Sequence, residues 1–335
     1  MAVVRRRSIK KIAFFDAKEY DEASFESCAK KYDLQFKYFA SKLSVDTVGL
    51  ARGCDGVCVF VNDDLSADVI DLLCESGIGI AALRCAGYNN ADAEYADGKI
   101  VLVRVPSYSP YAVAEHAMAM LLTCIRRTHK AYLRTRDFNF SLNRLTGFDL
   151  HAKTVGIVGT GKIGKVFARI CKGFGMNVIC YDKIRSGRLH YVDLATLFKE
   201  SDVVSLHCPL TDETYHMIDE RTLRTVKKDV VIVNTSRGGL IDSEALLSAL
   251  KERRVGAACL DVYEEEADVF FKDVSGRILD DDTLVRLISM PNVLVTSHQA
   301  YLTREALGNI AETTCDNLRR FFDGKALKNL VKKRG

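Results

Sequence analysis

The sequence lacks any long block of like charge. Its 48 lysines and arginines nearly balance its 44 aspartates and glutamates, which leaves a formal net charge of +4 over 335 residues. A protein that binds nucleic acid usually concentrates basic residues on one surface or along one helix. We therefore expect no nucleic-acid partner, and we expect a small molecule as the substrate.

Long apolar runs are missing as well. The one basic cluster, residues 5–7 with Lys10 and Lys11, is not followed by an apolar stretch long enough for a signal peptide or a membrane-spanning helix. We interpret the cluster as a solvated arm and expect no membrane partner.

The eleven cysteines include no C-x-x-C pair of the kind that binds structural zinc. Cys54 and Cys58 form a lone C-x₃-C, but both fall in an apolar segment typical of a strand. An odd number of cysteines without an export signal favours a reducing compartment. We expect a cytoplasmic protein without a metal site, whose thiols pack as small hydrophobic groups.

What the sequence does contain is a regular alternation of short apolar runs and longer helix-like segments, without repeats or low-complexity tracts. This alternation is typical of parallel sheets covered by helices on both faces, and the length suits about two domains. Six apolar runs, most of them rich in Val and Ile, predict a doubly wound sheet with strands at 154–158, 177–181, 202–206, 229–233, 256–260 and 292–296. Five earlier runs predict a second, smaller α/β domain with strands at 11–15, 35–39, 57–61, 78–83 and 100–105.

Two helices carry clear boundary signals. Ser109 can cap a helix that has Pro110 at its first position. Thr303 can cap another helix that runs to about residue 322, where Gly324 supplies a stop signal. We expect the first helix to be buried at the junction of the domains, because small side chains let other backbones approach it at Ala112, Ala114, Ala117 and Ala119.

A glycine-rich segment, Gly159-Thr160-Gly161-Lys162-Ile163-Gly164, directly follows the first predicted strand of the larger domain and opens an amphipathic segment. In that context the pattern G-x-G-x-x-G predicts a dinucleotide-binding loop. Gly159 allows the tight turn, Gly161 lets the pyrophosphate touch the backbone, and Gly164 lets helix and strand pack closely. The helix N-terminus then offers N–H groups to the phosphates.

Asp182 ends the next predicted strand, about twenty residues after the loop. A carboxylate there can accept hydrogen bonds from the adenosine ribose hydroxyls, and its charge would repel the additional phosphate of NADP. We therefore predict NAD as the cofactor. Lys183 and Arg185 leave open a partial acceptance of NADP, because either cation can offset the charge of Asp182.

Reactive side chains follow the predicted strands of the larger domain, at the edge where open α/β sheets bind ligands. Arg237 can hold a carboxylate with two hydrogen bonds, and His298 can exchange a proton near neutral pH. Glu266 can orient the imidazole and favour its charged form. Together they indicate a redox reaction on a small 2-keto acid. His207, at another strand end, either faces the cofactor or packs beneath the loop.

Several motifs resemble, in order and spacing, the D-2-hydroxyacid dehydrogenases of the fermentative D-lactate dehydrogenase type, and the resemblance covers nearly the whole chain. It implies that Arg237 binds the substrate, His298 is the acid/base and Glu266 supports His298. The motifs are Leu83-Arg84-Cys85-Ala86-Gly87-Tyr88-Asn89, Tyr108-Ser109-Pro110 with Ala114-Glu115-His116, Thr235-Ser236-Arg237-Gly238-Gly239, Asp261-Val262-Tyr263-Glu264, and His298-Gln299-Ala300.

The resemblance also implies further site residues and a domain plan. The backbone of Ala86 and Gly87 would meet the substrate together with Tyr108, and Tyr301 would close the pocket. A discontinuous flavodoxin-like domain of residues 1–105 and 301–335 would close over a Rossmann domain of residues 106–300. Besides the glycine loop and Asp182, the cofactor would be lined by Lys162, Ile163, Cys208, Pro209, Thr235, Ser236 and Asp261.

For the reaction itself, the resemblance implies reversible reduction of pyruvate to D-lactate. Larger 2-keto acids, hydroxypyruvate and glyoxylate stay open as substrates, because one methylene changes recognition by only about 1–3 kcal/mol in an apolar pocket. Another alternative is a corepressor-like module that binds NAD and a protein partner. The helix after Pro110 and the arm 134–145 are the expected contacts of a homodimer or homotetramer.

Overall fold

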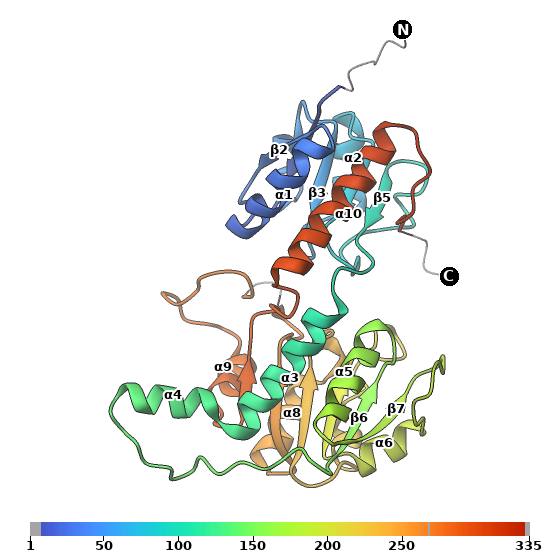
Figure 1. Cartoon of the computed structure of the whole chain (residues 1–335). Helices are drawn as coiled ribbons and strands as arrows, with labels where there is room; N and C mark the ends of the chain where they lie inside the picture. The colour runs from blue at the N-terminus through green and yellow to red at the C-terminus, as the bar shows by residue number, and fades with distance from the viewer. Residues whose placement is uncertain (1–7, 267–268, 332–335) are drawn as a thin grey trace. The chain divides into compact units, whose positions relative to one another are not determined.

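The computed structural model describes residues 8–266 and 269–331, and the chain divides into two compact units. One unit combines residues 1–109 with residues 302–335, and the other spans Pro110–Tyr301. The first break falls where helix α3 begins, a few residues after the predicted position at 106. Each unit contains one parallel sheet, visible in Figure 1.

The smaller unit has a five-stranded sheet in the order β2-β1-β3-β4-β5, which is the flavodoxin-like order and confirms the predicted fold class. Helix α10 (Arg304–Phe322) returns from the end of the chain and packs against α1 (Glu19–Lys31) and β4. The strands are β1 (Lys10–Phe14), β2 (Leu34–Tyr38), β3 (Gly56–Val59), β4 (Ile80–Leu83) and β5 (Val101–Arg104), and the other helices are η1 (Val48–Ala51) and α2 (Ala67–Glu75).

The larger unit has a six-stranded sheet in the order β11-β10-β9-β8-β6-β7, and it contains all six predicted strands. The chain changes direction across the sheet between β6 and β8, and ligands of doubly wound sheets bind at such a point. Beyond β7, one isolated bridge joins Cys180 to Tyr191 in place of a longer edge strand. The strands are β6 (Thr154–Val158), β7 (Asn177–Tyr181), β8 (Val203–Leu206), β9 (Val230–Asn234), β10 (Val255–Leu260) and β11 (Val293–Val295).

Apolar layers cover both faces of this sheet. Alternate side chains of β9 enter opposite layers, so that Val231 and Val233 pack with α3 and α5, whereas Val230 and Ile232 pack with α8 and α9. These layers stabilise the strands, and the loops at the strand ends are where the candidate site residues lie. The helices are α3 (Pro110–Arg126), α4 (Thr128–Arg136), α5 (Lys162–Gly173), α6 (Leu194–Glu200), α7 (Glu220–Leu223), η2 (Gly238–Leu240), α8 (Ser243–Lys251) and α9 (Asp282–Ser289).

The predicted helix boundaries are confirmed. Pro110 is the first residue of α3, and the Oγ1 atom of Thr303 accepts a hydrogen bond from the backbone N–H of Ala306 at 3.2 Å, which caps α10. Gly324, just after α10, has a φ of +64°. Three of the four alanines of α3 are buried, but Ala119 is exposed, so the expectation of close packing is wrong at that position.

All eleven cysteines are free thiols, and most of them are buried. Cys58 lies in β3 as predicted, whereas Cys54 precedes that strand and is partly exposed. Within residues 8–266 and 269–331, no three His, Cys, Asp or Glu side chains are grouped so that they could hold a metal ion. None of the helices in those ranges is long and apolar enough to cross a lipid bilayer.

Candidate active site

The glycine loop joins β6 to α5 at the point where the sheet order changes direction. Gly159 has a φ of +93°, and a Cβ atom there would lie 2.6 Å from the backbone of His207. A Cβ on Gly164 would lie 2.0 Å from the carbonyl oxygen of Gly159. The fold itself therefore requires both glycines, for the tight turn and for the close contact of helix and strand.

Gly161 is different, because a Cβ atom there would meet no protein atom within 4 Å. The missing side chain leaves open space directly over the N-terminus of α5, which has no side-chain cap to occupy its N–H groups. Nearby, the Oγ1 atom of Thr235 is buried without a hydrogen-bond partner among the described residues. The open helix N-terminus can bind a phosphate, and the Oγ1 atom of Thr235 can form a hydrogen bond with a ligand. Both features fit a bound dinucleotide.

Asp182 follows β7 and bonds back to the glycine loop. Its Oδ2 atom accepts hydrogen bonds from the N–H and the hydroxyl of Thr160 at 2.6 and 3.0 Å, and Oδ1 accepts one from the N–H of Ile184 at 2.9 Å. Burial alone would raise the pKa of Asp182, but these bonds and the charge of Lys165 hold the pKa below its usual value. The carboxylate is therefore charged at neutral pH.

The two cations beside Asp182 are engaged elsewhere. The ammonium of Lys183 forms an ion pair with Glu213, and the guanidinium of Arg185 lies 5.8 Å from the centre of the Tyr191 ring. Each of these cations therefore contacts a residue other than Asp182. Neither Lys183 nor Arg185 forms an ion pair with the carboxylate at the end of β7, and a charged carboxylate there favours NAD over NADP.

The loops after β8 and β9 are joined by Ser236, whose hydroxyl donates a hydrogen bond to the carbonyl of Cys208 at 2.6 Å. Pro209, the next residue, is exposed. His207 packs its ring 5.0 Å from that of Phe167, and its Nε2 atom lies 2.9 Å from the Oγ atom of Ser205. Of the two alternatives for His207, the structure supports packing beneath the loop.

Because burial disfavours its charged form, the pKa of His207 is lowered to about 4. The unfolded chain binds this proton below a pH of about 6.5, whereas the folded protein excludes it until about pH 4. We expect the free energy of unfolding to fall as the pH decreases between these values, by up to about 3 kcal/mol from this group. Urea unfolding of the wild type and of His207→Asn at several pH values measures the effect.

The asparagine variant should show a shallower pH dependence over that interval, because it has no proton to bind. The exposed His151, before β6, provides the control, and His151→Gln should retain the slope of the wild type. Equal slopes in the wild type and in His207→Asn would contradict the assignment.

The side chains of His298 and Glu266 are paired by a hydrogen bond. The Nδ1 atom of His298 lies 2.7 Å from Oε1 of Glu266, and both side chains are largely buried. Glu266 is itself fixed, because its Oε2 atom accepts a hydrogen bond from the N–H of Tyr263 at 3.0 Å. Since a carboxylate can only accept, Nδ1 carries the hydrogen and Nε2 is the atom that can gain or lose a proton.

His298 adopts a left-handed backbone conformation, with a φ of +52°. For a residue other than glycine this conformation costs on the order of 1–3 kcal/mol and persists only where the surroundings enforce it. Here Asp261 does so. Its carbonyl accepts from the N–H of His298 at 2.7 Å, and its carboxylate accepts from the N–H groups of Gln299 and Ala300, both at 2.9 Å.

Arg237 follows β9 in an extended conformation. Its guanidinium donates to the carbonyl of the preceding Ser236 at 2.6 Å, and its own carbonyl accepts from the side chain of Asn234 at 2.8 Å. Among the described residues, no carboxylate pairs with it. A fixed backbone and a guanidinium without a protein counter-ion suit the binding of a carboxylate ligand.

A second imidazole–carboxylate pair lies near these residues, and no pattern in the sequence points to it. Glu264 pairs with His216, and it also accepts hydrogen bonds from Tyr215 at 3.3 Å and Ser243 at 3.2 Å. The backbone of Gly238 packs so closely on residues 263 and 264 that a Cβ there would lie 2.0 Å from the carbonyl carbon of Tyr263. The pair therefore links the loops that follow β8, β9 and β10.

The predicted substrate residues Ala86, Gly87 and Tyr108 lie in the smaller unit, after β4 and β5. The guanidinium of Arg104 donates to the carbonyl of Ala86 at 2.6 Å, and the side chain of Asn309 donates to the carbonyl of Tyr108 at 2.7 Å. Tyr301 is the last residue of the larger unit and is buried. Their contact with a common substrate stays a prediction.

Fold and site together define an NAD-dependent dehydrogenase, and the comparisons with known proteins agree. The sequence profile of the D-isomer specific 2-hydroxyacid dehydrogenase NAD binding domain matches residues 118–300. D-lactate dehydrogenase of Escherichia coli is 47% identical over 325 residues, which cover 95% of this chain and 99% of that protein. The chain belongs to the D-2-hydroxyacid dehydrogenase family, which confirms the resemblance seen in the sequence.

Solved structures agree with this membership. The apo-structure of the E. coli enzyme matches with a TM-score of 0.88 and 45% identity, and it covers 96% of this chain and 100% of that one. A pyruvate reductase of Chlamydomonas reinhardtii matches with a TM-score of 0.91 and 39% identity, over 96% of this chain and 99% of that one.

Proposed function

We propose that the protein catalyses the reversible reduction of pyruvate to D-lactate with NADH. The observation that carries the proposal is the His298–Glu266 pair, held at 2.7 Å at the same edge of the sheet as Arg237 and the glycine loop. The relatives named D-lactate dehydrogenase and pyruvate reductase support pyruvate as the substrate.

Bound NADH would supply the hydride for C2 of the keto acid. Side chains of the protein bind the substrate and transfer the proton. Arg237 binds the carboxylate with two hydrogen bonds and orients the neighbouring carbonyl. As C2 receives the hydride, the Nε2 atom of His298 gives its proton to the carbonyl oxygen, which becomes the hydroxyl of lactate. Glu266 keeps the ring in the tautomer described above and places its carboxylate beside the imidazole.

The proposed cofactor contacts follow the strand ends. Gly159, Gly161 and Gly164 with Lys162 and Ile163 would hold the pyrophosphate at the N-terminus of α5, and Asp182 would accept from the adenosine ribose. The nicotinamide end would meet residues of the loops after β8 and β9, namely Cys208, Pro209, Thr235 and Ser236. Asp261, which the resemblance places at the cofactor, has a fully buried carboxylate bonded to residues 299 and 300, so we assign it instead to the loop that carries His298.

For the substrate we propose contacts with the backbone of Ala86 and Gly87, with Tyr108 and with Tyr301. In this plan the smaller unit, which corresponds to the predicted residues 1–105 and 301–335, is the substrate domain. The larger unit, Pro110–Tyr301, corresponds to the predicted residues 106–300 and is the NAD domain. Free thiols throughout the chain fit the reducing cytoplasm that we propose as its location.

Measuring NADH oxidation with pyruvate tests the proposal, followed by assay of the product with enzymes specific for each lactate enantiomer. Fast turnover to D-lactate is expected. Formation of L-lactate, or the absence of turnover, would contradict it. A series of keto acids with longer side chains, together with hydroxypyruvate and glyoxylate, would then show whether a larger substrate is preferred. Tight NADH binding without turnover of any of them would favour the corepressor-like alternative.

The preference for NADH should depend on the negative charge of Asp182. Replacing Asp182 by serine is expected to raise the ratio of kcat/KM for NADPH to that for NADH by about 10- to 100-fold, because the repulsion of the extra phosphate is removed. Adding Glu213→Gln should raise the ratio further, since it frees Lys183. Glu213→Gln alone should change the ratio little. An unchanged ratio in Asp182→Ser would contradict this role.

We further propose that the protein is a homodimer formed through the larger unit. Helix α4 and the segment after it reach away from the sheet (Figure 1) and expose large apolar side chains, among them Phe138 at 84% and Leu142 at 80%. Such exposure usually marks a contact surface. The same segment carries Arg134, Arg136 and Arg144.

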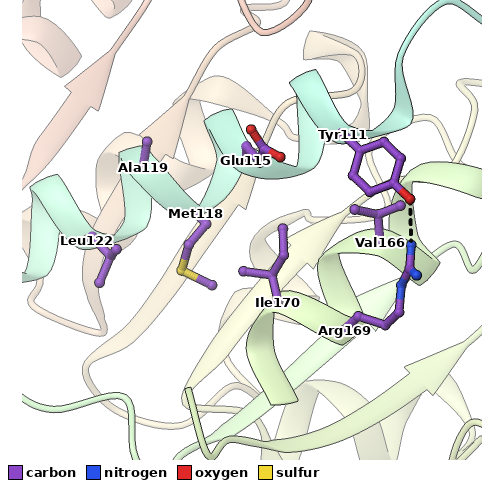
Figure 2. Close-up of a pocket in the computed structure, with 8 residues that line it drawn as sticks. All are labelled: Tyr111, Glu115, Met118, Ala119, Leu122, Val166, Arg169 and Ile170. Carbon is purple, nitrogen blue, oxygen red and sulfur yellow. Dashed lines mark hydrogen bonds between the residues drawn. The ribbon is translucent and has the colours of Figure 1, made fainter. Parts of the chain in front are cut away.

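A groove between α3 and α5 offers a complementary surface (Figure 2), with a volume of about 550 Å³. Its floor is apolar, and the exposed Glu115 at its side could meet an arginine of the partner's arm. The residues that line it are Tyr111, Glu115, Met118, Ala119, Leu122, Val166, Arg169 and Ile170.

The double variant Phe138→Ser/Leu142→Ser is expected to dissociate the dimer, because both side chains would lose their buried contacts in the partner. Sedimentation velocity of the double variant and of the wild type measures the change. Ile278→Ser, at an equally exposed position outside the arm, is the control and should remain dimeric. A monomeric wild type, or a dimeric double variant, would contradict the assignment, and a tetramer would require a further contact.

A further inference from the structure

Asp261 carries a buried charge that needs compensating partners. Its side chain has no exposed surface, and its pKa is held below the usual value: burial alone would raise it, but hydrogen bonds from His116, Thr296 and Ala300 outweigh that effect. A buried carboxylate is costly unless a cation or several hydrogen-bond donors compensate for it. Three of its partners are neutral groups: the hydroxyl of Thr296 and the N–H groups of Gln299 and Ala300.

The remaining partner is His116 on α3. Its Nε2 atom lies 3.2 Å from Oδ1 of Asp261 and 3.2 Å from Oγ1 of Thr296. The single hydrogen of the Thr296 hydroxyl is directed to Asp261, at 2.6 Å. Both atoms that face Nε2 are therefore acceptors, so Nε2 must carry a hydrogen. Among the described residues, His116 is the one basic side chain within ion-pair distance of Asp261.

Asp261 connects His116 to the loop that carries His298. Asp261 binds three successive N–H groups, those of residues 298–300, and in this way enforces the left-handed backbone of His298. If Asp261 lost its donor from α3, the buried carboxylate would be left with unsatisfied capacity and would attract water or turn away. Either change would release the backbone that presents the imidazole.

We propose that His116 is a positioning residue for catalysis, which acts through Asp261 to hold residues 298–300 and thus the acid/base His298. The proposal rests on the proposed function for the role of His298, but the structural link between His116 and the loop stands apart from it. His116 lies on a different helix from any residue assigned to the reaction, and nothing in its contacts requires it to touch the substrate.

The test compares His116→Leu, which removes the donor at similar volume, with His116→Gln, which retains an N–H donor. In His116→Leu we expect kcat to fall by about 10- to 100-fold, the range that a small misplacement of a reacting group produces. The KM for pyruvate and the affinity for NADH should stay close to the wild type, because Arg237 and the glycine loop are not touched. His116→Gln should recover a large part of the loss.

A second measurement does not depend on activity. Amide hydrogen exchange in a peptide covering residues 296–302, followed by mass spectrometry, should be at least about tenfold faster in His116→Leu, because the N–H groups of residues 298–300 are protected by Asp261. In His116→Gln the exchange should remain near the wild-type rate. His151→Gln, at the opposite edge of the sheet, serves as the control and should change neither readout.

Wild-type exchange and wild-type kcat in His116→Leu would overturn the proposal. An equal loss of NADH affinity and kcat in both variants would also overturn it, since that pattern marks a general loss of structure. If the wild type turned over no keto acid while the exchange result held, the proposed function would fail and the link from His116 to the loop would remain.

Discussion

Replacing His298 by asparagine is expected to reduce kcat for pyruvate reduction by about 10²- to 10⁴-fold, the usual contribution of a positioned general acid. Asparagine tolerates the left-handed backbone at this position, where φ is +52°, so the loop should keep its shape. The loss would then report the missing proton donor rather than a displaced loop. Steady-state kinetics with pyruvate, together with NADH binding followed by fluorescence, measures both effects.

NADH affinity should be unchanged in His298→Asn, because the cofactor contacts assigned above lie in other loops. Glu266→Gln should lose less activity, since an amide can still accept a hydrogen bond from Nδ1 and so keep the orientation of the ring. A kcat within a few-fold of the wild type in His298→Asn would remove His298 from the mechanism. A matched fall in NADH affinity would indicate a binding role instead.

The second large effect is expected for Arg237→Lys. The ammonium keeps the charge but cannot offer the two parallel N–H donors that match a carboxylate, so kcat/KM for pyruvate should fall by about 10²- to 10³-fold. Much of this loss should be a higher KM, because the carboxylate is bound before and during the reaction. The same kinetics measure it, with NADH affinity as the internal reference.

Arg237→Ala with added guanidinium provides a sharper version of this test. A soluble guanidinium ion that enters the vacated position should restore part of the activity, whereas ammonium should not. Unchanged kcat/KM in Arg237→Lys would mean that the carboxylate is bound elsewhere. Arg253→Lys, at an arginine on the turn after α8, is the matched control and should behave as the wild type.

The parts of the fold that the sequence predicts are those determined by local signals. Short apolar runs predict the strands of both sheets, because central parallel strands are apolar on both faces. The edge strand β2 (LQFKY) is the exception, since its side chains alternate between buried and exposed. Gly159 and Gly164 are identifiable because the tight turn and the close helix contact each exclude a side chain. The glycine loop, Asp182 and the loaded strand ends then follow from the general rule for ligand sites in such sheets.

The parts that the sequence does not reveal depend on contacts between distant residues. His116 and Asp261 are 145 positions apart, and no local pattern pairs them. The pair of His216 and Glu264 is hidden for the same reason, although Glu264 stands inside a recognised motif. The packing of His207 against Phe167 could not be separated from a cofactor contact without coordinates. Tyr191 forms a single bridge to Cys180 and does not stand in a run of Val and Ile. The sequence therefore gives no sign of a strand there.

The nucleotide-binding loop and the acid/base residue follow strands at different places in the sheet. The glycine loop follows β6, which is flanked by strands on both sides, whereas His298 follows β11, a three-residue strand at the edge of the sheet. Short edge elements open locally at a lower free energy than central ones. A molecule in which β11 has frayed would still hold its nucleotide while catalysing nothing. On heating, loss of turnover is therefore expected to precede loss of the nucleotide site.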